Sequence, residues 1–291
     1  MSQLFRKLLI GLFLLTSGVN LLSAQGVYDD FIYTRQAVTE RKVVPWPYLR
    51  EADVFWAKRI TRIIDVREKQ NKCMQWPKDP LNLILYNSVL DGKLIPYKND
   101  SLSSSFTIEE FLSFGADTSY VKNIIDPNGD PEDPFNQRLD TTVDRLNPLK
   151  ITKFRVLEDW IFDKKESRMF VRIISIAPQY KPRFGGQEMK TEQDLCVLKY
   201  HKDSKDADKN DIRDIMVNKE VFNRSNDAAR ITFDDWFEQR LFSSYIIKEA
   251  NQYDNNINEF AEFKDNGIAS LLESDKIKND LFLMEHDLWE Y

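Results

Sequence analysis

The stretch ITKFRVLEDWIFDKKESRMFVRIISIAP, residues 151–178, decides the fold class of this chain. Two runs rich in β-branched and aromatic residues, Lys153–Phe162 and Arg168–Ala177, flank a polar segment at Asp163–Ser167. Apolar runs bounded by a polar turn are typical of a β-hairpin. The second run is rich in Val and Ile, which predicts a strand that is buried on both faces. A further strand is predicted in EQDLCVLKY, residues 192–200.

Two segments with matching helix-start patterns lie on either side of the hairpin. FTIEEFL at 106–112 and ITFDDWF at 231–237 agree position by position in residue type. In each, a Thr precedes an acidic residue by three positions, the arrangement of a capping box. The pairs are Thr107 with Glu110 and Thr232 with Asp235. Two related halves of one chain would explain the match, and so would a shared helix-start chemistry.

Helices are also predicted at Leu81–Leu90 and at Phe233–Glu249, and in the second of these the apolar residues lie along a helical face. A short strand is expected at Leu94–Tyr97. Together with the hairpin, these segments predict an α+β fold. We expect two related or juxtaposed halves with short mixed helices and antiparallel hairpins, preceded by an extended N-terminal arm.

The charged stretch Arg50–Lys72 is predicted to form an amphipathic helix, because its apolar residues fall on one side at helical spacing. These residues are Trp56, Ile60, Ile63 and Ile64. A strand is the alternative, but Lys58 and Arg62 would interrupt its apolar face. Spacings of three and four residues then predict ion pairs within the helix. The pairs are Asp65–Lys69 and Glu68–Lys72.

Composition divides the chain into six parts. A basic start, an apolar run at Leu8–Leu15 and small residues before Ala24 predict a cleaved signal peptide, since the run is short for a membrane span. Four prolines without a hydrophobic period predict a linker between the halves. The parts are the signal peptide (1–24), the arm (25–48), one α+β half (49–125), the linker (126–150), a second α+β half (151–255) and an amphipathic tail (256–291).

The sequence contains no recognised catalytic, cofactor or metal motif. Neither of the two His residues, His201 and His286, has a second ligand at metal spacing. There is no G-x-S-x-G elbow, and the nine Gly form no phosphate loop. A net charge of −6 gives no field that would attract nucleic acid. We predict no enzyme and no cofactor; a hydrolase with two carboxylates that meet in the fold, or a periplasmic ligand-binding module, is the alternative.

Cysteines and aromatic residues supply the remaining candidates. Cys73 and Cys196 could pair in an exported protein, or remain two buried thiols. The 6 Trp, 11 Tyr and 19 Phe fit a protein that forms interfaces, where Trp and Tyr act as anchors. The candidates for partner contact are Trp46, Tyr48, Trp56, Phe282 and Trp289. The tail is expected either to close the protein's own core or to lie in a partner's groove.

Three long segments resemble the GldN family, also called PorN, of gliding-motility and type IX secretion proteins of the Bacteroidetes. The segments are PYLREADVFWAKRITRIIDVREKQN (47–71), EDWIFDKKESRMFVRIISIAP (158–178) and EVFNRSNDAARITFDDWFEQRLFSSYIIKEANQYDN (220–255). The resemblance implies a periplasmic ring subunit at the inner face of the outer membrane, with no membrane span of its own. It implies a lipoprotein partner, GldK or PorK, together with other secretion components, and no catalytic residues.

Overall fold

The computed structural model describes residues 41–125, 137–184, 187–201, 211–226, 228–264 and 266–287. The chain from Ala37 onward forms one compact unit. The predicted signal peptide and residues 25–40 of the predicted arm lie outside the described residues, as does Trp289. Residues 41–50 have no regular secondary structure.

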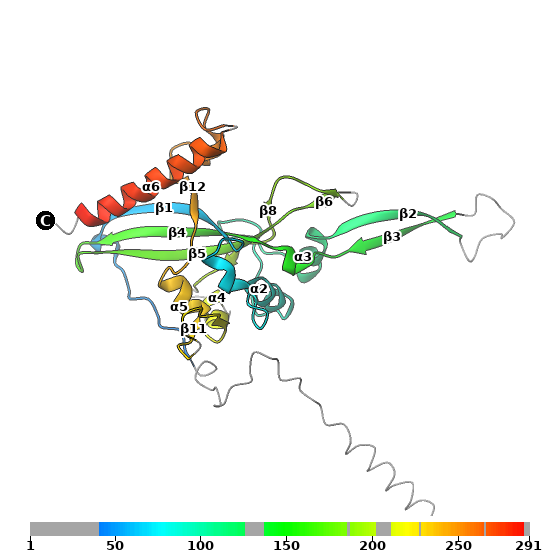
Figure 1. Cartoon of the computed structure of the whole chain (residues 1–291), viewed down its shortest axis with the longest axis horizontal. Coiled ribbons are helices and arrows are strands. Elements are labelled where there is room, and N and C mark those ends of the chain that lie inside the picture. The colour runs from blue at the N-terminus through cyan, green and yellow to red at the C-terminus, as the bar shows by residue number, and fades with distance from the viewer. Residues whose placement is uncertain are drawn as a thin grey trace, which may run out of the picture. The chain divides into compact units, whose positions relative to one another are not determined.

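A central antiparallel sheet organises this unit, with strand order β12-β1-β4-β5-β8 and β9 paired to β5 (Figure 1). Its strands are β1 (Val54–Asp65), β4 (Lys153–Asp163), β5 (Arg168–Tyr180), β8 (Gln193–Asp194), β9 (Leu198–Lys199) and β12 (Tyr245–Glu249). The predicted hairpin is confirmed as β4 and β5. The segment 192–200 contributes two short strands instead of one. Because β1 comes from the first expected half and the other strands from the second, both halves share one sheet.

β1 shows that the helix predicted for Arg50–Lys72 is wrong. This strand pairs with β4 from Val54 to Asp65 and with β12 on its other edge. The charges that would interrupt an apolar strand face instead meet partners across the sheet. The cross-strand ion pairs are Arg59–Asp159 at 2.8 Å, Arg62–Glu158 at 2.5 Å and Lys58–Glu249. The pair predicted between Asp65 and Lys69 is replaced by one between Asp65 and Arg67 at 2.5 Å.

The helices lie on two sides of the sheet in Figure 1, with α2, α4 and α5 below the strands and α6 above them. The helices are α2 (Leu81–Leu90), α3 (Ile108–Phe114), α4 (Ile212–Met216), α5 (Phe233–Glu238) and α6 (Gly267–Asp287). Short 3-10 turns lie at η1 (Glu51–Asp53), η2 (Asn71–Gln75), η3 (Pro148–Lys150) and η4 (Ile257–Glu259). The predicted helix Leu81–Leu90 and both capping boxes are confirmed.

The helix predicted over Phe233–Glu249 is correct only in its first part. α5 ends at Glu238, and Arg240 adopts a positive φ of 54°, which an α-helix does not tolerate. The chain then turns and forms β12, whose Ile246 N–H donates to the Ser274 hydroxyl of α6 at 2.8 Å. Phe242 and Ile246 of this segment are buried and Leu241, Tyr245 and Ile247 are half-buried, but the second part of the segment is a strand and not a continued helix.

In the described part of the chain, three small two-stranded sheets accompany the central sheet. They are β2 (Asp117–Ile125) with β3 (Gln137–Asp144), β6 (Arg183–Phe184) with β7 (Gln187–Glu188), and β10 (Glu220–Val221) with β11 (Ile231–Thr232). The linker predicted at 126–150 is wrong for Gln137–Asp144, which form β3. The strand predicted at Leu94–Tyr97 is reduced to isolated bridges from Tyr97 to Ser105 and Val197.

Among the described residues, the buried side chains form two clusters. The larger contains residues from the central sheet, α2 and α5, and includes Cys73 and Cys196. Both cysteines are free buried thiols, so the disulfide alternative is not realised in this structure. The smaller cluster joins β1, β12 and α6; its members are Ile60, Ile246, Ile257, Ile277 and Leu281. α6 thus closes part of the protein's own core.

Candidate interaction surfaces

Trp46 fixes the C-terminal part of the arm to the body of the protein. Its indole N–H donates to the Glu238 carboxylate at 3.0 Å. The guanidinium carbons of Arg172 and Arg213 lie 5.5 and 5.2 Å from the ring centre, within the range of cation–π attraction. Arg172 also donates to the Pro47 carbonyl at 2.7 Å. Trp46, a predicted partner residue, therefore contacts its own chain on several sides.

A buried polar network lies beneath this indole and connects α4 to α5. Arg213 donates two hydrogen bonds to the Asp234 carboxylate, at 2.8 and 3.1 Å. The Tyr200 hydroxyl donates to Glu238 at 3.2 Å. Burial, with the nearby carboxylates, raises the pKa of Tyr200 well above its usual value, so the hydroxyl keeps its proton. The arm therefore lies on a network of hydrogen bonds that connects Arg213 to Asp234 and Tyr200 to Glu238.

A second buried network links the sheet to the end of α5. The Glu158 carboxylate is completely buried and accepts from Arg240 at 2.9 and 3.2 Å and from the Trp160 indole at 2.9 Å. Burial alone would raise the pKa of Glu158, but Arg62 and Arg240 outweigh it and the pKa is lowered. Burial lowers the pKa of Arg62 to about 10 despite its ion pair. These ionised groups are enclosed by the protein and serve the packing of β1, β4 and α5.

The other predicted partner residues differ in exposure. Tyr48 is 90% exposed and Phe282 is 65% exposed. Trp56 is half-buried and packs against the smaller core cluster. Trp56 therefore contributes to the packing of its own chain. Tyr48 and Phe282 are placed where a second protein could reach them.

α6 has two apolar faces. One face carries Ser274, Ile277 and Leu281, which are buried against the body. At 3.6 residues per turn, a second group of apolar residues falls on the opposite side and is exposed. This group, which we call the outer face of α6, consists of Ile268, Leu271, Leu272, Phe282 and Leu283. The sequence shows which residues of this segment are apolar. Which of them are buried against the body and which are exposed depends on how the helix packs in the structure.

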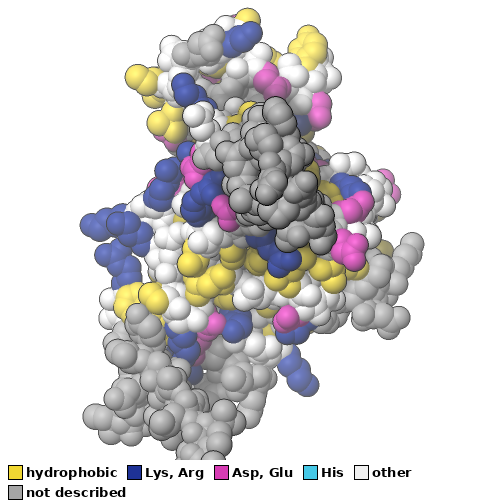
Figure 2. All heavy atoms as spheres, turned by 90° about the vertical axis from the view of Figure 1, so that its right-hand side faces the viewer, with side chains coloured by type: hydrophobic (Ala, Val, Ile, Leu, Met, Phe, Trp, Pro, Cys, Tyr) yellow, Lys and Arg dark blue, Asp and Glu magenta, His cyan; other side chains and the backbone are white. Residues whose placement is uncertain are grey.

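Figure 2 looks onto the end of the molecule that carries the β2–β3 hairpin and shows apolar side chains gathered across it, with Lys and Arg side chains around them. Elements at this end contribute exposed apolar residues that the sequence did not single out. They include Phe114 of α3, Val143 of β3 and Leu149 of η3. Their exposure marks a second apolar surface on the body.

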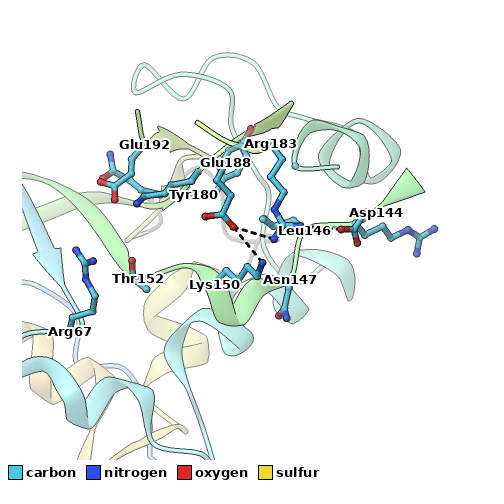
Figure 3. Close-up of a pocket in the computed structure, with 14 residues that line it drawn as sticks. Arg67, Asp144, Leu146, Asn147, Lys150, Thr152, Tyr180, Arg183, Glu188 and Glu192 are labelled. Carbon is cyan, nitrogen blue, oxygen red and sulfur yellow. Dashed lines mark hydrogen bonds and ion pairs between the residues drawn. The ribbon is translucent and has the colours of Figure 1, made fainter. Parts of the chain in front are cut away.

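A cavity of about 560 Å³ lies near the base of the β2–β3 hairpin (Figure 3). Dashed lines in Figure 3 mark ion pairs from Glu188 to Arg183 at 3.2 Å and to Lys150 at 3.5 Å. Arg183 also pairs with Asp144 at 3.1 Å. Each carboxylate that lines this cavity faces a cation, since Glu192 pairs with Lys153 outside it at 2.6 Å. The lining of this cavity is thus a network of ion pairs.

Within the described part of the chain, no group of three or more His, Cys, Asp or Glu residues could hold a metal ion. His201 lies 3.6 Å from Asp211 and against the Trp46 ring, so it belongs to the support of the arm. No described helix has the length and hydropathy that crossing a membrane requires.

A family model described as Gliding motility associated protein GldN matches residues 49–290. This range contains every helix and strand from η1 to α6. No curated protein matches the chain. The family match agrees with the resemblance carried by the three long segments.

Proposed function

The chain belongs to the GldN family of gliding-motility and type IX secretion components, and on that premise we propose that it is a non-catalytic structural subunit of the periplasmic ring of this machinery. Its partner in this proposal is an outer-membrane lipoprotein of the GldK or PorK kind. The signal peptide predicted at 1–24 supports export, and a lipoprotein partner would supply attachment to the outer membrane.

The outer face of α6 is the observation that carries the proposal. Two apolar groups, one around Leu271 and one around Phe282, are separated by the polar residues Asp275 and Asn279. Exposed apolar clusters bounded by polar residues are typical of protein interaction sites. A helix that presents an apolar face can be laid into a groove on a partner.

α6 is also well prepared for such contact, because its inner face is already fixed. Ile277 and Leu281 are buried in the smaller core cluster, and the Ser274 hydroxyl accepts a backbone hydrogen bond from β12. Binding a partner would therefore order few additional torsions in the helix. A preordered surface loses less conformational entropy on association, which favours affinity.

Photo-crosslinking in living cells tests this proposal directly. A photoreactive residue at Leu272 or Phe282 should crosslink to one outer-membrane lipoprotein, and mass spectrometry would identify it. The matched control is the same residue at Lys93, which is exposed in the turn after α2. Crosslinking at all three positions alike, or recovery of only free monomer from gently lysed cells, would count against the proposal.

Charge substitution gives a second measure. Leu272→Asp with Phe282→Asp should reduce co-purification with the outer membrane at least tenfold, while the thermal midpoint of the isolated protein stays within a few degrees, because both side chains are exposed. The control pair Tyr253→Asp with Lys93→Asp alters exposed residues outside α6. An equal loss from both pairs would mean that the outer face has no special part in assembly.

A further inference from the structure

A second surface cavity, of about 570 Å³, lies beside η2 on a part of the protein that the proposed ring function does not use. We call it the Trp76 pocket. Its lining residues are Lys69, Lys72, Cys73, Gln75, Trp76, Pro77, Phe222 and Arg224. The volume falls within the range of pockets that bind small ligands and short peptide segments.

The floor of the Trp76 pocket is aromatic. The Trp76 and Phe222 rings lie 5.9 Å apart at an angle of 45°, and they come from separate elements, the end of η2 and the end of β10. Phe222 is 42% exposed even though it lies beside a large core. The Cys73 thiol is buried, and burial raises its pKa, so the neutral thiol adds apolar surface. A partly open aromatic pair favours a flat apolar or aromatic group.

The rim of the Trp76 pocket is cationic. Among the residues that the structure describes, the charged ones that line it are Lys69, Lys72 and Arg224, and none of the lining residues is a carboxylate. Arg224 donates to the Lys69 backbone carbonyl at 3.3 Å. In the described part of the chain, Lys69 and Lys72 form no ion pair with a carboxylate. In a protein with a net charge of −6, three neighbouring cations without carboxylates between them favour an anionic ligand.

We propose that the Trp76 pocket binds an acidic peptide segment of a partner protein, in which a Trp, Tyr or Phe side chain is flanked by Asp or Glu. The aromatic side chain would lie on Trp76 and Phe222, and the flanking carboxylates would meet the three cations of the rim. The acidic charge of the whole chain disfavours the alternative of a nucleic-acid strand stacked on the same rings. This inference does not depend on the ring function, because it uses a different surface.

Fluorescence anisotropy on the full mature chain tests the ligand class. The probe is a fluorescein-labelled peptide, Gly-Asp-Glu-Trp-Glu-Asp-Gly. We expect saturable binding that weakens at least fivefold between 50 and 300 mM salt, as screening of exposed charges requires. Replacing its Trp by Ala, or its acids by Asn and Gln, should each weaken binding at least fivefold. Equal binding of all three peptides, or tighter binding of a labelled oligothymidine, would overturn the proposal.

Variants then locate the site. The combined change Lys69→Gln, Lys72→Gln and Arg224→Gln should weaken probe binding at least tenfold, and Phe222→Ala at least threefold. The matched controls are Lys93→Gln, Lys164→Gln and Lys278→Gln together, and Tyr253→Ala, which are exposed outside the pocket and should change binding less than twofold. Unchanged binding by the pocket variants would overturn the proposal. So would a loss of self-association in the triple variant without loss of probe binding, because the occupant would then be a second copy of this chain.

Discussion

α3 and α5 begin with the same capping interactions but are buried to different extents. In each, the Thr hydroxyl accepts a hydrogen bond from the backbone N–H three residues later. The carboxylate of that later residue accepts a hydrogen bond from the Thr backbone N–H. In α3 only Phe111 is buried, whereas four of the six residues of α5 are buried. A capping box therefore determines where a helix begins, but the tertiary structure determines how much of that helix matters for stability.

Substitutions at the position after the Thr should show the largest difference in stability between the two helices. Phe233 is completely buried in the larger core, while its counterpart Ile108 is 46% exposed. Phe233→Ala should lower the free energy of unfolding by about 3–5 kcal/mol through lost burial and a cavity, and Ile108→Ala by less than about 1 kcal/mol. Urea denaturation of both variants measures this. Similar losses would contradict the burial that distinguishes the helices.

The next position compares a buried acid with an exposed one. Asp234 is paired with the buried guanidinium of Arg213, and Glu109 is exposed at the start of α3. Asp234→Ala should lower the free energy of unfolding by about 3 kcal/mol, because it leaves the buried Arg213 guanidinium with only the more distant Glu238 carboxylate, at 3.8 Å. Glu109→Ala should change stability by about 0.5 kcal/mol or less. If the double variant Asp234→Ala, Arg213→Met were no more stable than Asp234→Ala alone, the stranded charge would not be the cause.

The caps themselves should differ by less. Thr232 is fully buried and Thr107 is exposed, although their hydroxyls accept hydrogen bonds of similar length, 3.1 and 3.2 Å. Thr232→Ala should lower the free energy of unfolding by about 2 kcal/mol, near the upper end for a lost cap. Thr232 is buried, so water replaces the lost hydrogen bond to the Asp235 N–H less well than at an exposed cap. Thr107→Ala should cost about 0.5–1 kcal/mol. Thr→Ser at either site should recover most of the loss, and failure of this rescue would argue against a capping role.

The smallest expected effect is a pH dependence of stability at the start of α3. The Glu110 carboxylate accepts from the Thr107 N–H at 3.0 Å and pairs with Lys98, which together lower the pKa of Glu110. Its contribution to stability is present above the unfolded pKa of about 4.3 and is lost as the pH falls through the lower folded pKa. NMR titration should show Glu110 ionising below an ordinary Glu, and Glu110→Gln identifies its signal. A titration at or above the ordinary value would contradict the capping box.

Local patterns predicted the elements whose partners lie nearby in sequence. The β4–β5 hairpin needs only a four-residue connection between two strands, and α2 forms from the mostly apolar segment Leu81–Leu90. Both capping boxes depend on residues three positions apart. In each case the interactions that decide the structure lie within one short segment of the chain.

β1 and β12 could not be predicted in this way, because their partners are remote. Arg62 looks unsuited to a buried strand until Glu158 is placed beside it by β4, almost a hundred residues later. Tyr245–Glu249 have helical spacing, but Arg240 ends α5 and β1 offers an open edge for pairing. Tertiary pairing outweighed the weak intrinsic preference for helix.

The candidate surfaces divide in the same way. The sequence identified Trp46, Tyr48, Trp56 and Phe282 as aromatic residues suited to contact, but only the structure separates Trp46, which fixes the arm, from Phe282, which is exposed on α6. The Trp76 pocket was not predicted, since Lys72 and Phe222 lie far apart in the chain. The sequence showed Lys69 and Lys72 as cations of this region, but it predicted that each would pair with a carboxylate within a helix.

By itself the sequence determined the α+β class, the family, the hairpin, α2 and the starts of α3 and α5, because short-range hydrogen bonding and hydrophobic periodicity specify these features. The tertiary structure alone decided that Arg50–Lys72 contributes a strand, that α6 has one face buried and one exposed, and which aromatic residues remain accessible. Burial and ion pairing across the sheet depend on contacts between residues far apart in the chain, and these contacts exist only after the sheet has formed.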